Sequence, residues 1–135
     1  MTDPLAAGRD RLAAFMERVD QIRVEDLLTY AAHPLDPAAH RRARDEAERI
    51  AIEQGREHDV RDAREAAERY VLTLYNRSDR QPGWYEVNWG RPGTVEDRAW
   101  LASSLGAAVV AILLADELPD DVLDQLLGPW GTLVE

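Results

Sequence analysis

Apolar residues recur every three or four positions along most of the chain, a spacing that is typical of amphipathic α-helices. The first such run follows Asp3-Pro4, an acidic N-cap with proline at the first helical position, and it extends to about residue 20. A short second helix is expected over 25–32. His33-Pro34 ends it, because the residue before a proline is disfavoured in the α region.

A helical hairpin is predicted over about 36–76, with helices at 36–54 and 58–76. Asp36-Pro37 repeats the start signal, and a stripe of alanines follows it. Beside Gly55 the apolar stripe rotates by roughly 80°, counted at 100° per residue. Such a change of phase beside a glycine is typical of a helix end and a tight turn. The alanines of the stripe are Ala39, Ala43 and Ala47.

Charged residues of opposite sign support the first helix of this hairpin, because they lie four positions apart, where side chains on a helix meet. Each such pair adds only a few tenths of a kcal/mol, so their number matters more than any one of them. The spacing therefore predicts three ion pairs along one helix. They are Arg42–Glu46, Arg44–Glu48 and Asp45–Arg49.

A buried apolar helix is predicted at about 94–115. Thr94 is a suitable N-cap, and the 17 residues from Ala99 to Ala115 carry no charge. Seventeen residues rise only about 25 Å, against a hydrocarbon core of about 30 Å, so a helix surrounded by protein is favoured over a membrane span. We expect its face of small residues to pack on the alanine stripe. The small residues are Ala99, Ser103, Ala107, Ala111 and Ala115, and the large ones opposite are Leu101, Leu105, Val109 and Leu113.

A last short helix is expected between Pro119 and Gly128, and Trp130 beyond it is expected to fold back on the bundle. A chain of 135 residues fits one domain with a core of its own. We therefore predict a single all-α domain over 1–135. Its architecture is a compact bundle of five or six helices with the 94–115 helix at the centre.

Composition excludes several kinds of chemistry. The chain has no cysteine, and all 16 of its basic residues are arginines, so disulfides, thiol nucleophiles and lysine catalysis are absent. No glycine-rich phosphate loop and no nucleophile elbow occur. We expect no cofactor. No secretory signal opens the sequence, so a cytoplasmic location is the expectation.

The net charge of −10 is unevenly spread, because residues 99–135 carry six acidic residues and no basic one. An acidic surface repels phosphate backbones, so nucleic-acid binding is not expected. The acidic last helix suits a basic protein partner or a second copy of the chain, and a surface charged for solubility is the alternative. The expected partners are therefore proteins, without nucleic acid or membrane.

Two histidine–aspartate pairs have the spacing of metal ligands on a helix. Asp36 and His40 lie four apart on one predicted helix, and His58 and Asp62 lie four apart on the next. The hairpin separates the two pairs, since one lies near the start of its first helix and the other lies at the turn. We therefore expect no metal site, with Asp36 as an N-cap and the histidines on the surface.

Two acid pairs lie one on each arm of the hairpin, and oxygen ligands of this kind suit Mg²⁺. They are Asp45 with Glu48 and Glu65 with Glu68. Glu65 and Glu68 flank the apolar stripe of their helix, and arginines four positions away offer pairing, which favours a solvated surface. A Mg²⁺- or Mn²⁺-dependent phosphohydrolase that uses these carboxylates is the enzymatic alternative.

The long loop over 77–93 is the strongest local candidate for a binding site. It contains the aromatic and arginine side chains that are enriched at binding hot spots, and these could stack on a planar or anionic ligand. The alternative is that the rings plug one end of the bundle. The residues are Arg80, Trp84, Tyr85, Trp89 and Arg91.

The preferred function is a small, acidic, non-enzymatic accessory or protein-interaction module, with self-association into a dimer as one option. It rests on the acidic end, the aromatic loop and the poor catalytic inventory. The alternatives are the metal-dependent phosphohydrolase and a small-ligand-binding domain centred on the loop at 80–91.

Overall fold

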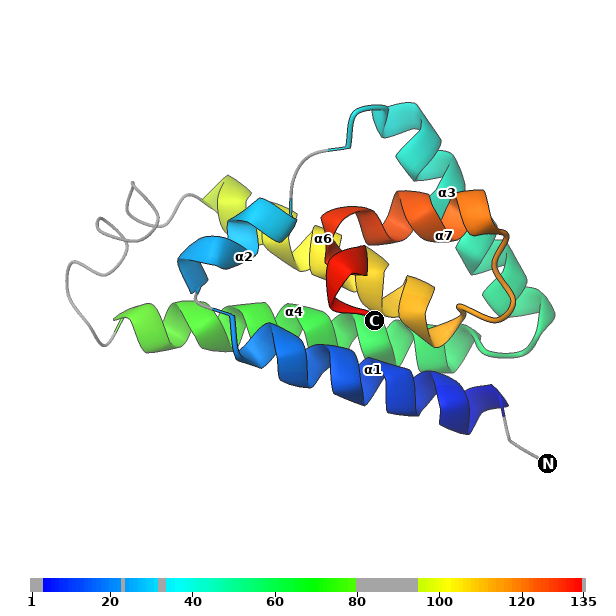
Figure 1. Ribbon diagram of the computed structural model, residues 1–135, viewed down its shortest axis with the longest axis horizontal. Helices are drawn as coiled ribbons and strands as arrows, with labels where there is room; N and C mark the ends of the chain where they lie inside the picture. Colours follow the sequence, from blue (N-terminus) through cyan, green and yellow to red (C-terminus); the bar gives the residue numbers. More distant parts are fainter. Residues whose placement is uncertain (1–3, 23, 32–33, 80–94, 135) are drawn as a thin grey trace.

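The computed structural model describes residues 4–22, 24–31, 34–79 and 95–134. These ranges contain six α-helices, one 3-10 helix and no strand, so the predicted all-α bundle is confirmed (Figure 1). None of these helices combines the length and the apolar character that a membrane crossing requires. The elements are α1 (Pro4–Asp20), α2 (Val24–Tyr30), α3 (Pro37–Glu53), α4 (Glu57–Asp79), α6 (Val95–Leu113), α7 (Asp120–Leu127) and η1 (Gly128–Leu133).

The two helices of the predicted hairpin are confirmed, and the local sequence signals mark their ends as expected. The Asp36 carboxylate caps α3 by accepting hydrogen bonds from the backbone N–H groups of Ala38 and Ala39, both at 3.1 Å. At the other end Gly55 has a φ of +68°, and the N–H of Arg56 donates to the carbonyl of Ala51 at 2.8 Å. A left-handed glycine with this hydrogen bond is the Schellman end of a helix, so the chain turns directly into α4.

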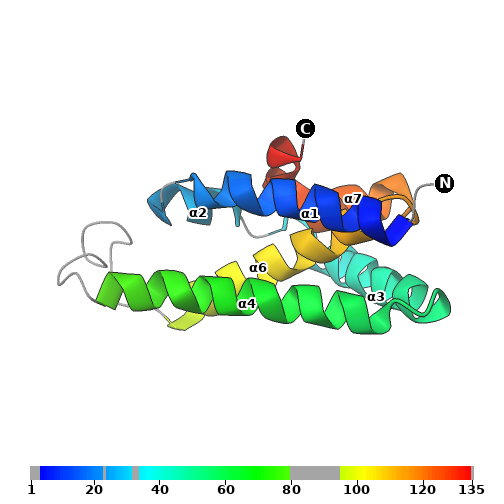
Figure 2. The ribbon, with the colours of Figure 1, turned by 90° about the horizontal axis from the view of Figure 1, so that it is seen from below.

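The two arms of the hairpin diverge from this turn, as Figures 1 and 2 show from two directions. α3 packs chiefly against α7, whereas α4 packs chiefly against α6. We expected the alanine stripe of α3 to pack on the small face of α6. This expectation is wrong, because the main packing partner of α3 is α7. The reason is that α7 supplies an apolar face to α3, with Leu126 and Leu127 buried.

The centre of the bundle is α6, as predicted (Figure 1). Every residue from 104 to 114 is buried. Trp130 folds back as expected and is 1% exposed, with its ring centroid 6.0 Å from that of Phe15 and 5.5 Å from that of Tyr30. Its indole N–H donates to the Ser104 hydroxyl at 2.9 Å. One side chain thereby joins η1 to α1, α2 and α6.

The C-terminal end of α6 is closed by an arginine and a glycine. Arg56 is 6% exposed, and its guanidinium donates to the carbonyl of Leu113 at 2.9 Å and lies 3.0 Å from the Glu117 carboxylate. The cation meets the negative end of the helix dipole there. On α1, Gly8 approaches so closely that an added Cβ would lie 2.6 Å from the Leu113 carbonyl oxygen. This end of the core is therefore sealed by contacts that leave little room for change.

Candidate binding cleft

A cleft of about 540 Å³ opens between α3 and α4, with α6 at its base and Leu126 of α7 beside it. Pockets of 300–1,000 Å³ are the usual size for specific ligands. The base consists of small residues, three of which belong to the small face predicted for α6. The residues that α6 contributes are Ala99, Ala102, Ser103, Gly106, Ala107 and Val110.

The walls of the cleft carry six charged side chains above this apolar base. α3 contributes four of them and α4 contributes two, and arginines and carboxylates are present in equal number. The described lining of the cleft is therefore neutral, in a chain whose net charge is −10. Leu72 of α4, which is 47% exposed, adds a large apolar side chain to the same wall. The charged residues, named from here on as the cleft charges, are Arg41, Arg44, Asp45, Glu48, Arg64 and Glu68.

No cleft charge forms a hydrogen bond or an ion pair through its side chain with any other residue of the ranges that the structure describes. The predicted pairs Arg44–Glu48 and Asp45–Arg49 are accordingly wrong, and the predicted pair Arg42–Glu46 does not form either. Two of these outcomes have one reason: Arg49 pairs with Glu53 instead of Asp45, and it takes Glu46 from Arg42.

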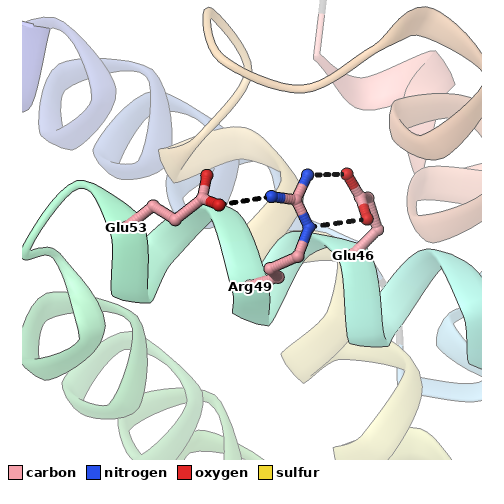
Figure 3. Close-up of polar contacts among 3 residues, drawn as sticks. All are labelled: Glu46, Arg49 and Glu53. Atoms are coloured by element: carbon pink, nitrogen blue, oxygen red, sulfur yellow. Dashed lines mark hydrogen bonds and ion pairs between the residues drawn. The ribbon is translucent and has the colours of Figure 1, made fainter.

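On the outer face of α3, by contrast, the charged side chains are paired, as Figure 3 shows. Arg49 donates to both oxygens of Glu46, with Nε at 3.1 Å from one of them, and also pairs with Glu53. These hydrogen bonds lower the pKa of the Glu46 carboxyl and raise the pKa of the Arg49 guanidinium. At 100° per residue this network points well away from the cleft. Within the described part of the chain, α3 thus carries a paired set of charges on one side and an unpaired set on the other.

Among the cleft charges, Arg64 has a side chain that packs closely against α6. Its stem crosses α6 at Gly106, where an added Cβ would lie 3.2 Å from the Arg64 Cγ. Its Nε is buried and has no hydrogen-bond acceptor among the described residues. A buried donor without an acceptor is uncommon in native proteins and marks a place where a bound acceptor would add stability.

Three of the four carboxylates in the predicted acid pairs line the same cleft. Asp45 and Glu48 of the first pair and Glu68 of the second line the same cleft, whereas Glu65 does not line it. Three carboxylates therefore share one cleft although they come from different helices. Across the described part of the chain, however, no three His, Asp or Glu side chains are close enough to hold a metal ion together.

The histidine pairs do not form a joint site. His58 and Asp62 are exposed, with 3.8 Å between Nε2 and a carboxylate oxygen, and Asp36 serves as the α3 cap. His40 is half-buried, and burial followed by the nearby positive charge of Arg44 lowers the pKa of its imidazole. The exposed position of His58 agrees with the surface role expected for it, whereas the half-buried position of His40 does not.

Some acidic side chains of the C-terminal end pair with arginines of the same chain. Asp116 lies 3.2 Å from Arg11, and Glu117 lies against the buried Arg56. Asp120 and Asp121 occupy the first turn of α7, where carboxylates stabilise the helix dipole. The excess of acid that the sequence indicates for a partner is therefore smaller than the composition implies.

The aromatic loop lies outside the residues that the structure describes. Arg80, Trp84, Tyr85, Trp89 and Arg91 all fall within 80–94. Whether they bind a ligand or plug the bundle stays a prediction from the sequence.

The sequence pattern singles out Asp45, Glu48 and Glu68, but it gives no sign of Arg64 and Gly106 as a unit. A glycine inside an otherwise apolar helix is the one signal that could have indicated a close approach. Comparison with models of known protein families, with curated proteins and with solved structures finds no match. The cleft therefore has to be interpreted from its own residues.

Proposed function

We propose that this protein is a non-enzymatic interaction module that holds a segment of a protein partner in the cleft between α3 and α4. The observation that carries the proposal is that none of the six cleft charges has a side-chain partner among the described residues, although α3 carries a paired network on its outer face. Charged groups without intramolecular partners are free to pair across an interface.

The base of the cleft supports a protein segment as the occupant. Small residues on α6 allow another backbone to approach closely, and the apolar surface there gains free energy when it leaves water. Leu72 offers an apolar contact at the edge. The mixed signs of the walls add selectivity, because a partner with the wrong charges would face repulsion and desolvation.

Site-specific photo-crosslinking tests this proposal in the cells that make the protein. A photoreactive amino acid replaces Leu72 in the cleft wall or, as the matched control, Ile52, which is 53% exposed on α3 and does not line the cleft. We expect one defined adduct from position 72 and none from position 52. Adding Arg64→Glu should abolish the adduct, since Arg64 lies inside the cleft.

The same experiment has a clear negative result. Adducts of equal yield from positions 72 and 52, or an adduct at 72 that is insensitive to Arg64→Glu, would show that the cleft has no special affinity for a partner. The proposal would then be wrong.

A second candidate function is the metal-dependent phosphohydrolase, and one observation favours it: carboxylates of both acid pairs line one cleft. Its test is thermal unfolding with Mg²⁺ or Mn²⁺ and a nucleoside triphosphate, together with phosphate release. A ligand at 100 times its Kd adds about 2.7 kcal/mol, which raises the midpoint by several degrees. A shift that Glu48→Gln abolishes would favour this enzyme over the interaction module.

A further inference from the structure

The signs of the cleft charges alternate between the two walls and between two levels of the cleft. On α3 the basic Arg41 and Arg44 lie farther from the turn than the acidic Asp45 and Glu48, whereas on α4 the basic Arg64 lies nearer the turn than the acidic Glu68. At 1.5 Å per residue, Glu48 lies about 8 Å before the end of α3 and Arg64 about 11 Å after the start of α4. Arg41 and Glu68 lie farther from the turn, at about 18 and 17 Å. The inner level is thus acidic on the α3 wall and basic on the α4 wall, and the outer level has the reverse signs.

Building on the proposed function, we propose that the cleft recognises an amphipathic helix of another protein whose charges mirror this alternation. Toward α3 the helix carries a basic residue at the inner level and an acidic residue at the outer level. Toward α4 it carries an acidic residue at the inner level and a basic one at the outer level. Its apolar ridge lies on the small residues of α6, in the manner of a helix in a groove.

The spacing of the cleft charges sets the spacing in the partner. Glu48 and Arg41 are seven positions apart, about two helical turns, and Arg64 and Glu68 are four apart, about one turn. The partner helix therefore presents opposite charges at i and i+7 on one flank and at i and i+4 on the other. Its carboxylate at the inner level pairs with the guanidinium of Arg64, which has no ion pair among the described residues.

The pattern of signs, taken alone, is the same for both directions of the partner helix, whereas the i, i+7 and i, i+4 spacings of its flanks fit one direction only. Turning the partner helix end over end exchanges both its flanks and its levels, and the two exchanges together restore the same pattern of signs. A helix with every sign inverted mismatches the cleft in both directions. Charge signs alone therefore distinguish a partner from a non-partner of identical composition.

Two synthetic peptides of about 18 residues, a length of about 27 Å as a helix, test this inference. Both have the same leucine and alanine ridge and the same composition, and both are stapled so that they are helical in solution. The matched peptide carries the signs derived above, and the inverted peptide carries the opposite signs. Binding to the full-length protein is measured by fluorescence anisotropy.

We expect the matched peptide to bind at least tenfold more tightly than the inverted one, a difference of about 1.4 kcal/mol. A variant with Arg41→Glu, Glu48→Arg, Arg64→Glu and Glu68→Arg reverses the alternation while its net charge stays at −10, since two charges are reversed in each direction. This variant should prefer the inverted peptide by a similar factor.

Equal affinities for the two peptides, or no binding of either, would overturn the inference, and so would an unchanged preference in the four-residue variant. A crosslinked product at position 72 made of two copies of this chain would overturn it as well, because the occupant would then be the protein itself. In each of these cases a cleft-specific adduct at position 72 would still support the proposed function. A failure of the proposed charge pattern can thus be distinguished from a failure of the proposed function as an interaction module.

Discussion

An arginine packs against α6 at two places, each time beside a glycine: Gly8 of α1 at the C-terminal end and Gly106 of α6 itself in the middle. At the C-terminal end, Arg56 is buried between the Leu113 carbonyl and Glu117, and Gly8 brings the backbone of α1 into contact. Over the middle of the helix, Arg64 lies across Gly106 with its Nε unpartnered, and a cleft stays open beside it.

The Nε atoms of both arginines are buried without an acceptor among the described residues, so the difference lies in the rest of the guanidinium: that of Arg56 binds the Leu113 carbonyl and pairs with Glu117, whereas that of Arg64 has no ion pair among the described residues. Breaking a buried ion pair leaves an uncompensated charge, which destabilises a protein by about 3–5 kcal/mol. Removing a charge that has no partner among the described residues leaves no buried counter-charge behind, so it does not lower the free energy of unfolding in this way. The sealed end should therefore control folding, and the cleft should control association.

The largest effect is expected at the sealed end. Arg56→Met should lower the free energy of unfolding by about 3–5 kcal/mol, because Glu117 and the end of α6 lose their cation. Urea unfolding followed by circular dichroism measures this loss. Adding Glu117→Gln to the same chain should recover a part of it, and a loss below about 1 kcal/mol in the single variant would contradict the account.

The two glycines give the next largest contrast. Gly8→Ala should destabilise by about 1–3 kcal/mol, offset by up to about 1 kcal/mol of helix propensity, because the new Cβ meets a backbone carbonyl that cannot move. Gly106→Ala should be neutral or stabilising by up to about 1 kcal/mol, because the Arg64 side chain can move aside. Thermal midpoints of the two variants, measured side by side, check this, and equal losses would contradict it.

A smaller stability effect is expected in the cleft. Arg64→Met keeps an apolar stem against α6 and removes a charge without a partner, so the free energy of unfolding should change by less than about 1 kcal/mol. Affinity for the matched helix should nevertheless fall about tenfold, which corresponds to about 1.4 kcal/mol. Urea unfolding and anisotropy on the same preparation separate the two quantities. Arg69→Met, on the same helix but outside the cleft, is the control for both.

The smallest effect concerns His40, whose lowered pKa has burial as its first cause and the charge of Arg44 as its second. Because the folded pKa lies below the usual 6.5, the unfolded chain binds more protons in that range. The contribution of His40 to stability is therefore complete above pH 6.5 and decreases as the pH falls through the folded pKa.

Titration of the His40 ring by NMR measures this pKa directly. Arg44→Met should raise it toward 6.5, since one cause of the shift is removed. An unchanged pKa would mean that the charge of Arg44 is already neutralised by a neighbour, which would contradict its unpaired state in the cleft.

Local signals in the sequence were sufficient for the helices. Asp36-Pro37 and Gly55 mark the ends of α3 through backbone chemistry that involves only neighbouring residues, and the absence of charge identifies α6 as the central helix. These features depend on a few adjacent positions, so a single sequence can reveal them. For α4 the prediction ended at 76, whereas the helix continues to Asp79.

The cleft could not be predicted, because it arises from contacts between distant segments. α7 packs against α3 and separates it from α6, and no local pattern specifies that choice. The ion pairs failed for a related reason. Arg49 has several carboxylates within one turn, and the spacing alone does not decide that it pairs with Glu46 and Glu53.

Chemical labelling of arginines in the cells that make the protein tests most directly that the cleft is occupied by a partner. Phenylglyoxal modification is read by mass spectrometry at Arg41 and Arg44 in the cleft, and at Arg42 and Arg69, which are exposed outside it. All four should react at similar rates in the dilute purified protein. In the cells we predict protection of Arg41 and Arg44 alone. Equal reactivity of all four arginines in both settings would contradict the account.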